Sequence, residues 1–492
     1  MALVDWLIAA AYLITVLFVG FYAGSREENE ADFLVGGRNV PWPAVLASLI
    51  ATEISAATFL AVPGIGFGEN MTYLQFGIGS ILARFFVAAV FIGVFYNAGC
   101  MSIYEFLGKR FGRRSQYAGS LLFLVTRLMA SGVRMLIAAK GLSVIFGMPL
   151  HWVIITFTLF TVIYIGYGGI KAVIWTDCVQ AIVFTGAGVA ALCYIVQVMG
   201  WHSFVSAGME GGRFEIFRLV PDGEGIGAWL SDSKTLLMAV LFGFISTTAA
   251  MGTDQDLTQR LLSARNAAGA RRSMALSGFV AIPIAALFLL VGVGLYGISG
   301  TPMGAALTNL SSNDEAFPRF ICAIAPAGLR GLLVAGVLAA AMSSFDSAVA
   351  ALGSSVLRDL IEPLTGREGK RLNHLMISRV LIYVFAIALA LIAWLFRDSK
   401  TFLWLAFQVT SVTYGVLLGV FLLGLRGRRG NDTGNMLAIG LGLLVAAISL
   451  AAIKLGWISL AWTWVIAIGA SVTYAVGSAF KRNENDSKSL YE

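Results

Sequence analysis

The sequence predicts an all-α polytopic membrane protein with about 13 transmembrane helices. Of its 492 residues, 58% are hydrophobic and only 12% are charged, a balance that is too apolar for a soluble globular protein. Apolar stretches of about 20 residues, the length that crosses a bilayer as a helix, recur along the whole chain. The lipid bilayer is therefore its first expected partner. The net charge of +7 is typical of basic cytoplasmic loops, so we expect no nucleic-acid partner.

The expected spans follow one another through mostly short loops. The first six are 4–24, 43–65, 72–96, 117–146, 150–167 and 172–199. The other seven are 235–254, 272–299, 328–358, 373–396, 401–425, 434–455 and 459–479. No basic region precedes the first span, so we expect a retained helix instead of a cleaved signal. The longest loops have about 30 residues, too few for a soluble catalytic domain.

The distribution of basic residues sets the expected orientation. With the N-terminus outside, roughly three-quarters of the loop lysines and arginines, including Arg260, lie in cytoplasmic loops. An odd number of spans also places the termini on opposite sides. We therefore expect a multi-pass plasma-membrane protein with an extracellular or periplasmic N-terminus and a cytoplasmic C-terminus. The C-terminal stretch KRNENDSKSLYE is polar and is predicted to be disordered.

Oxygen-bearing side chains form a stripe on the ninth span, in the stretch AAAMSSFDSAVAA. Ala340, Ser343, Asp346 and Ser347 share one helix face, and Ser344 borders it. A carboxylate at membrane depth is costly and usually faces an ion or substrate pathway. Hydroxyl and carboxylate oxygens together suit a hard monovalent cation. The alternative is a serine stripe that packs helices closely, which leaves the carboxylate unexplained.

Polar residues also interrupt the second span, SLIATEISAATFLAVPGIGFGEN. Glu53, Ser55 and Thr58 fall within its apolar run, and Pro63 and Gly64 follow. Unwound backbone at membrane depth is tolerated only where it is buried in protein or lines a watery cavity, and freed carbonyls there can coordinate a cation. The alternative is a helix that ends at Pro63. The stretch FISTTAAMGTDQDLTQR predicts a second discontinuous helix on the same grounds.

Three of the other charged residues within the spans are further candidates for the site. Arg127 and Arg134 are seven residues apart on one face of the fourth span, and arginine suits carboxylate ligands. The alternative is that they pair with Glu53 or another carboxylate of the protein. Asp177 lies about two turns into its helix, where the helix dipole and Lys171 offer a structural alternative.

Several other patterns exclude function classes. The stretch GVGLYG matches a dinucleotide-binding pattern but lies inside an apolar span, and Gly415 and Gly419 indicate close helix packing. There is no P-loop lysine and no nucleophile–base pair, so we expect neither an ATP-driven pump nor an enzyme. The three histidines lack metal-ligand spacing, so the only metal expected is sodium, as a coupling ion and not as a cofactor.

Four of these stretches together resemble the sodium:solute symporter family. GGIKAVIWTDCVQ is similar to its most recognisable segment, ATEISAATFLAVPG to its first core helix, GTDQDLTQR to the exit of its sixth and AAAMSSFDS to its eighth. The resemblance implies a LeuT-type fold of two inverted five-helix repeats. It implies a leading helix and cytoplasmic loop (1–42), a first repeat (43–199), an extracellular loop (200–234), a second repeat (235–425), and two trailing helices with a cytoplasmic tail (426–492).

The resemblance also implies binding residues. The family's principal sodium site corresponds to Ala51, Ile54, Ala340, Ser343 and Ser344 in this sequence. A second cation site, present in part of the family, falls on Asp177, Asp346 and Ser347, where Asp346 replaces the expected serine or threonine. The solute contacts fall on Glu53, Ser55, Thr58, Tyr73, Gln75, Arg127, Arg134 and Thr247. The sialic-acid branch uses an arginine that aligns near Ala130, so the two arginines match by face only.

The expected function is therefore sodium-coupled secondary active symport, importing a small polar organic solute by alternating access. Carboxylates, amino acids and sugars are the candidate solute classes, and Arg127, Arg134 and Glu53 favour a small carboxylate or zwitterion. A proton-coupled symporter with Asp177, Asp346 or Glu53 as carrier stays open, as does a passive channel or sensor. We expect no obligate protein partner.

Overall fold

In the computed structural model, the described residues are 1–25, 30–365, 373–398, 402–427 and 429–482. Within them the regular structure is helical, and a single isolated bridge joins Val40 to Ala264. The prediction of an all-α protein is thus confirmed. The polar tail predicted to be disordered lies, from residue 483 on, outside the described residues.

Long helices account for most of the chain. They are α1 (Leu3–Gly24), α5 (Leu74–Val90), α8 (Arg113–Phe146), α9 (Leu150–Met199), α12 (Leu236–Thr253), α14 (Ala267–Ser299), α16 (Leu329–Ser355), α18 (His374–Leu395), α19 (Phe402–Arg426), α20 (Asp432–Lys454) and α21 (Trp464–Ser478).

Shorter helices continue or connect the long ones. They are α2 (Glu30–Val35), α3 (Trp42–Glu53), α4 (Ala56–Gly68), α6 (Ile92–Asn97), α7 (Ile103–Arg110), α10 (Trp201–Glu210), α11 (Gly225–Ser231), α13 (Gln255–Leu262), α15 (Ala316–Arg319) and α17 (Glu362–Thr365). Turns of 3₁₀ or π helix occupy Gly36–Arg38, Pro302–Leu307, Asn313–Glu315, Phe320–Ile324 and Val356–Ile361.

The number of helices that can cross a bilayer differs from the expected 13. Among the described residues, 10 helices are long and apolar enough, and the bent pair α3–α4 makes 11. Two expected spans, 150–167 and 172–199, fall within α9, whose two helical segments meet at a kink where Gly169 is not helical (φ 50°, ψ −150°). The last expected span contains α21, which is apolar but only 15 residues long.

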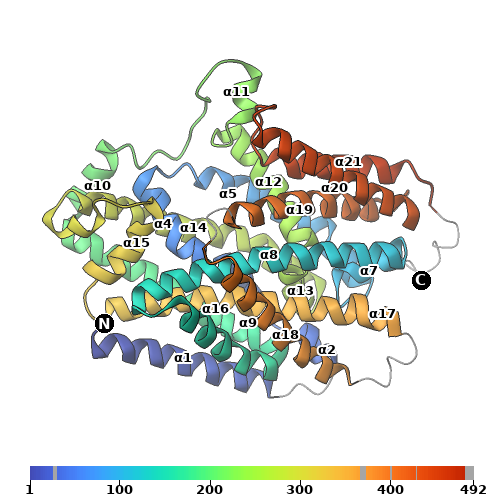
Figure 1. Cartoon of the computed structure of the whole chain (residues 1–492), viewed down its shortest axis with the longest axis horizontal. Helices are drawn as coiled ribbons and strands as arrows, with labels where there is room; N and C mark the ends of the chain where they lie inside the picture. Colours follow the sequence, from blue (N-terminus) through green and yellow to red (C-terminus); the bar gives the residue numbers. More distant parts are fainter. Residues whose placement is uncertain (26–29, 366–372, 399–401, 428, 483–492) are drawn as a thin grey trace.

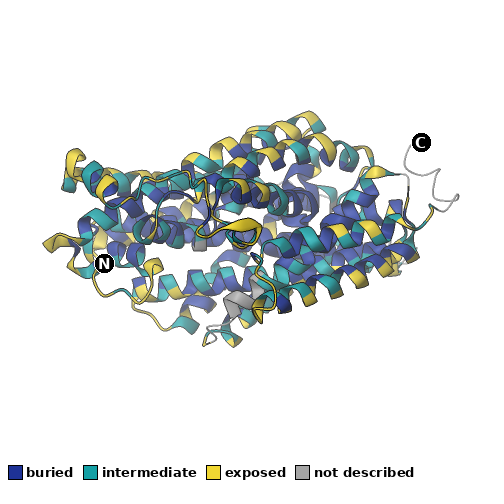
Figure 2. Ribbon diagram, turned by 90° about the horizontal axis from the view of Figure 1, so that it is seen from above, coloured by how far each residue is buried: buried dark blue, intermediate teal, exposed yellow. Residues whose placement is uncertain are grey.

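Helix α16 forms the centre of the molecule. In Figure 1, α1, α8 and α16 run along the long axis, and α16 packs against α9, α8 and α1. In the most apolar part of the α16 segment 89% of the residues are buried, whereas in that of α1 only 28% are. Figure 2 shows buried residues towards the middle of the molecule and exposed ones on the outward faces of the helices. Because exposed residues of α1 such as Ile14 and Phe18 are apolar, this outer surface is suited to lipid.

Glycines allow helix backbones to touch where the sequence predicts close packing. A Cβ added to Gly415 of α19 would lie 2.6 Å from the carbonyl oxygen of Ile466 on α21. Likewise, a Cβ at Gly292 of α14 would lie 2.0 Å from the carbonyl oxygen of Pro63 on α4. The GVGLYG stretch therefore serves helix packing, because only a residue without a side chain fits there.

Two helix pairs are separated by short non-helical interruptions. Residues 42–53 and 58–68 form helices that meet at an angle of 62°. The alternative that the second span ends at Pro63 is wrong, since α4 continues to Gly68. In the other pair, α12 runs unbroken through Thr247 and the interruption comes at Asp254, which is extended (φ −103°, ψ 122°).

Candidate functional site

The interruption between α3 and α4 frees backbone groups in the interior. Ile54 (φ −84°, ψ 92°) and Ser55 (φ −84°, ψ 168°) have extended conformations. The Thr58 N–H, which would bond to the Ile54 carbonyl in a continuous helix, is bound by the Ser55 hydroxyl at 3.4 Å. Ala51 is fully buried and Ile54 is 5% exposed. Both predicted carbonyl ligands thus belong to the buried end of α3.

The serines predicted to bind sodium lie opposite, on α16. Ser343 and Ser344 are buried. The Ser344 hydroxyl donates to the Ala340 carbonyl at 3.2 Å, and the Ser343 hydroxyl donates to Oδ1 of Asp177 on α9. Each hydroxyl keeps acceptor lone pairs after donating its proton, so both remain able to bind a cation.

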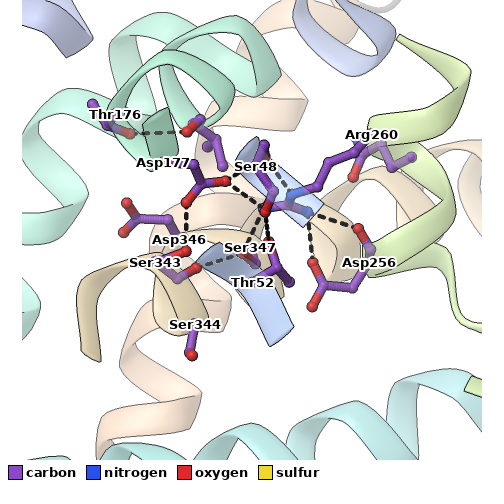
Figure 3. A network of polar contacts seen from close by, with 12 residues as sticks. Ser48, Thr52, Thr176, Asp177, Asp256, Arg260, Ser343, Ser344, Asp346 and Ser347 are labelled. Atoms are coloured by element: carbon purple, nitrogen blue, oxygen red, sulfur yellow. Dashed lines mark hydrogen bonds and ion pairs between the residues drawn. The ribbon is translucent and has the colours of Figure 1, made fainter. Parts of the chain in front are cut away.

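Side-chain hydrogen bonds connect α3 with α16 directly and through α9. The Thr52 and Ser347 hydroxyls are 3.3 Å apart. The Asp177 carboxylate accepts hydrogen bonds from Ser48 of α3 and Ser343 of α16. The two elements that carry the predicted sodium ligands therefore meet in the core of the protein, as Figure 3 shows.

Arg260 lies beside this junction (Figure 3). The sequence had instead predicted that it belongs to a loop. Its side chain is completely buried. Nη2 donates to Asp177 Oδ2 at 3.1 Å and to the Ser347 hydroxyl, and Nε donates to Ser48 at 2.8 Å. Nη1 donates to the Asp256 carboxylate at 2.9 Å and to its backbone carbonyl at 2.7 Å. The loop prediction for Arg260 is wrong, because it lies on helix α13, which packs against α16 and α3.

Asp346, the third residue of the predicted second cation site, has different surroundings. The Tyr164 hydroxyl donates to its Oδ2, and its buried Oδ1 has no hydrogen-bond partner among the described residues. In Figure 3 the Asp346 carboxylate points away from Arg260. The three predicted second-site residues are therefore split, with Asp177 and Ser347 bound to Arg260 and Asp346 bound to Tyr164.

A cavity of about 530 Å³ adjoins the interrupted helices, a volume that suits a small organic solute. It is lined by seven of the predicted solute contacts: Glu53, Ser55, Thr58, Tyr73, Arg127, Arg134 and Thr247. Hydroxyl groups that were not predicted also line it: Thr52, Ser246, Thr410, Ser411 and Tyr414.

Gln75, the remaining predicted solute contact, is not among the residues that line this cavity. Its side chain is fully buried. It donates to the carbonyls of Thr72 (3.2 Å) and Lys234 (3.0 Å) and accepts from the Arg218 N–H (3.1 Å). These bonds attach the start of α5 to the loop before α12, which is a structural role.

The charged residues of the cavity are paired unequally. Arg127 forms ion pairs with Asp254 (2.5 Å) and Asp256 (3.1 Å) and is 3% exposed. Within the described chain, Arg134 has no carboxylate partner, although it lines the same cavity. The alternative that the arginines pair with protein carboxylates is thus confirmed for Arg127 alone.

Glu53 pairs with a different arginine from the one considered in the sequence. It forms an ion pair with Arg84 of α5, whose side chain is fully buried, while Glu53 itself is 34% exposed. Arg84 also donates to the hydroxyls of Ser277 and Ser80. Glu53 therefore faces the cavity as a carboxylate whose charge is already balanced.

The comparison with known families decides the class of protein. A family model described as the sodium:solute symporter family matches residues 33–442. The chain belongs to that family. Sodium is the coupling ion of this symporter, which is a transporter and not an enzyme, and its many apolar helices make it a multi-pass membrane protein.

Individual relatives of this symporter are distant in sequence. The sodium/glucose cotransporter of Vibrio parahaemolyticus is 25% identical, over 89% of this chain and 83% of its own. The sodium/sialic acid symporter SiaT of Proteus mirabilis is 26% identical, over 92% of this chain and 90% of its own. A solved structure of a substrate-bound, outward-open Na⁺-coupled sialic acid symporter matches with a TM-score of 0.85 at 23% identity, covering 97% of both chains. The latter likeness shows the helical fold.

Several residues of this symporter's site were missed because their partners are distant in sequence. Arg84 and Arg260 are buried opposite Glu53 and Asp177, at separations of 31 and 83 residues. The i, i+4 spacing of Asp256 and Arg260 was the one signal available, since it places opposite charges on one helix face. Nothing in the sequence pattern indicated that α13 would be buried.

Proposed function

We propose that this symporter imports a small organic carboxylate together with sodium, by alternating access across the plasma membrane. Arg134 is the main argument for this solute class, because it lines the cavity and no protein carboxylate among the described residues lies within ion-pair distance of it. An arginine in such a place pairs well with a ligand carboxylate through its planar fork of N–H donors. Arg127 serves the site indirectly, since Asp254 and Asp256 already take its charge.

Hydroxyl groups on three sides of the cavity would bind the polar remainder of the solute. Ser55 and Thr58 come from the start of α4, Thr247 from α12, and Tyr73 from the start of α5. Glu53 lies beside them and is balanced by Arg84, so it can accept a hydrogen bond without adding a net negative charge. This arrangement supports a carboxylate that also carries hydroxyl or amino groups.

The proposed sodium site consists of the carbonyls of Ala51, Ile54 and Ala340 and the hydroxyls of Ser343 and Ser344. Its support is the interrupted ladder at Ile54 and the connection of α3 to α16 through Asp177. Sodium bound there would hold the two elements together. Since Ser55 and Thr58 directly follow this interruption and line the cavity, ion and solute would stabilise one another's bound state.

We further infer two inverted repeats within 13 spans. The first repeat would occupy 43–199 and the second 235–425, with 1–42 leading, 200–234 as an outer loop and 426–492 trailing. The interruptions support this division, because α3–α4 and α12–α13 each stand first in one repeat. Loop charge supports an outer N-terminus and a cytoplasmic C-terminus.

Uptake into proteoliposomes containing the purified protein tests the proposal. A panel of radiolabelled carboxylates, amino acids and sugars is offered under an inward sodium gradient, with choline replacing sodium in parallel vesicles. We expect sodium-dependent uptake of a carboxylate above its outside concentration. Uptake driven by an imposed proton gradient in choline would contradict sodium coupling, and equilibration without concentration would indicate a passive channel.

A further inference from the structure

The guanidinium of Arg260 is completely enclosed by acceptors. A guanidinium carries five N–H donors. In this structure they donate to Ser48, Asp177, Ser347 and, twice, to Asp256. The Arg260, Asp177 and Asp256 side chains are all at most 1% exposed. No donor of this cation is thus left for water or for a solute.

The Asp177 carboxylate accepts all of its described hydrogen bonds from Arg260 and from serines beside it. Its Oδ2 accepts from Ser48 and from Arg260, and its Oδ1 accepts from Ser343. The Ser347 hydroxyl accepts from Arg260 and donates to the Ser343 carbonyl. Two of the three residues that would form a second cation site therefore already bind a cation, which belongs to the protein.

A sodium ion between Asp177 and Ser347 would lie against this guanidinium. Like charges at such short range repel strongly away from bulk water. The alternative is that Arg260 leaves to admit the ion, but departure would strip five hydrogen bonds from a buried arginine and separate it from Asp256. Asp346 cannot replace Asp177 there, since its carboxylate is bound to Tyr164 and points away from Arg260 (Figure 3).

We propose that Arg260 permanently takes the place of the second cation, so that the symporter binds and moves one sodium ion per cycle. Asp177 then serves as a positioning residue, holding Ser343 towards the principal site and balancing the charge of Arg260. Arg260 thereby determines the ion stoichiometry without touching the solute. This inference rests on the proposed sodium-coupled function.

Direct binding of ²²Na⁺ to the purified protein tests the stoichiometry. We expect saturation at one ion per chain in the wild type and in Arg260→Lys, which keeps a cation in place. Arg260→Met frees Asp177 and Ser347, so bound sodium should double to two ions per chain. Arg265→Met is the matched control, because Arg265 is exposed, and it should bind one ion.

The number of sodium ions bound by the wild type tests the inference even if a variant fails to fold. Size-exclusion chromatography and thermal unfolding show whether each variant is folded. Two ions per wild-type chain, or a single ion in folded Arg260→Met, would overturn the inference. The sodium-to-solute ratio at which wild-type proteoliposomes show no net flux gives a second measurement, and we expect a ratio of one. No bound sodium at all would instead contradict the proposed function.

Discussion

The hydroxyl of Ser343 donates a hydrogen bond to the carboxylate of Asp177, which joins α16 to α9 next to the interruption of α3. The same carboxylate accepts from Ser48 on α3, so one buried acid orients side chains from both elements that carry the proposed sodium ligands. Sodium affinity should therefore depend on residues that never touch the ion as well as on those that do.

Replacing both Ser343 and Ser344 with alanine should raise the sodium concentration for half-maximal uptake at least about tenfold, equivalent to about 1.4 kcal/mol of binding free energy. The reason is the loss of two hydroxyl oxygens from the proposed site. Ser354→Ala is a matched control, since Ser354 is buried on the same helix and donates to the Ala351 carbonyl. Equal sodium dependence in the double variant and the control would count against the site.

Arg134→Gln should abolish uptake of a carboxylate solute while leaving the fold intact. The change removes the one cavity arginine that lacks a carboxylate partner among the described residues. We expect the apparent affinity for the carboxylate to fall about 100-fold, and Arg134→Lys to recover part of it. Competition by the solute and by its neutral amide against the labelled solute measures this; equal weakening of both competitors would show that Arg134 does not bind the carboxylate.

Arg127→Gln should act through stability instead. It leaves Asp254 without an ion-pair partner in a fully buried position, and breaking a buried ion pair costs about 3–5 kcal/mol. We expect a lower unfolding temperature in detergent and a parallel loss of uptake for every solute. Normal stability with selective loss of the carboxylate would instead place Arg127 in direct contact with the solute.

The Glu53–Arg84 ion pair should show energetic coupling. Glu53→Gln leaves the buried Arg84 without its carboxylate, whereas Glu53→Gln combined with Arg84→Met removes both charges. A double-mutant cycle on thermal unfolding should give a coupling energy of about 0.5–3 kcal/mol. Additive effects would show that the pair does not stabilise the fold.

Asp346→Asn should leave the sodium-to-solute ratio unchanged. An asparagine has nearly the same shape and can still accept the hydrogen bond from Tyr164, and the Asp346 carboxylate forms no ion pair among the described residues. Reversal potentials or zero-flux ratios measured at several sodium gradients test this expectation. A lower ratio in the variant would assign a second ion to Asp346.

The sequence was a good guide to elements whose signal is local. The interruption near Ile54 could be predicted because polar residues break an apolar run, and the serines of α16 because they repeat at helical spacing. The role of Arg260 could not be predicted, because a polar stretch after an apolar span is typical of a loop. Its burial depends on α3, α9 and α16 supplying acceptors from three distant parts of the chain.

The same limit explains why the contacts of Gln75 and Arg84 were not predicted from the sequence. Gln75 matched the resemblance by position, but its amide bonds with the segment around Lys234, and local pattern contains no information about that contact. Arg84 lies buried within an apolar span, and its carboxylate partner comes from a different helix. Partner choice between helices depends on how they pack, which a single sequence does not encode in any short motif.

Because the charge of Arg260 is covalently part of the protein, it returns with the empty carrier. Over a complete transport cycle it therefore performs no net electrical work. One sodium ion moving with a univalent organic anion then transfers no net charge. A voltage across the membrane would neither drive nor resist such a cycle. The steepest solute gradient this protein could sustain would equal the sodium gradient, even in a strongly polarised cell.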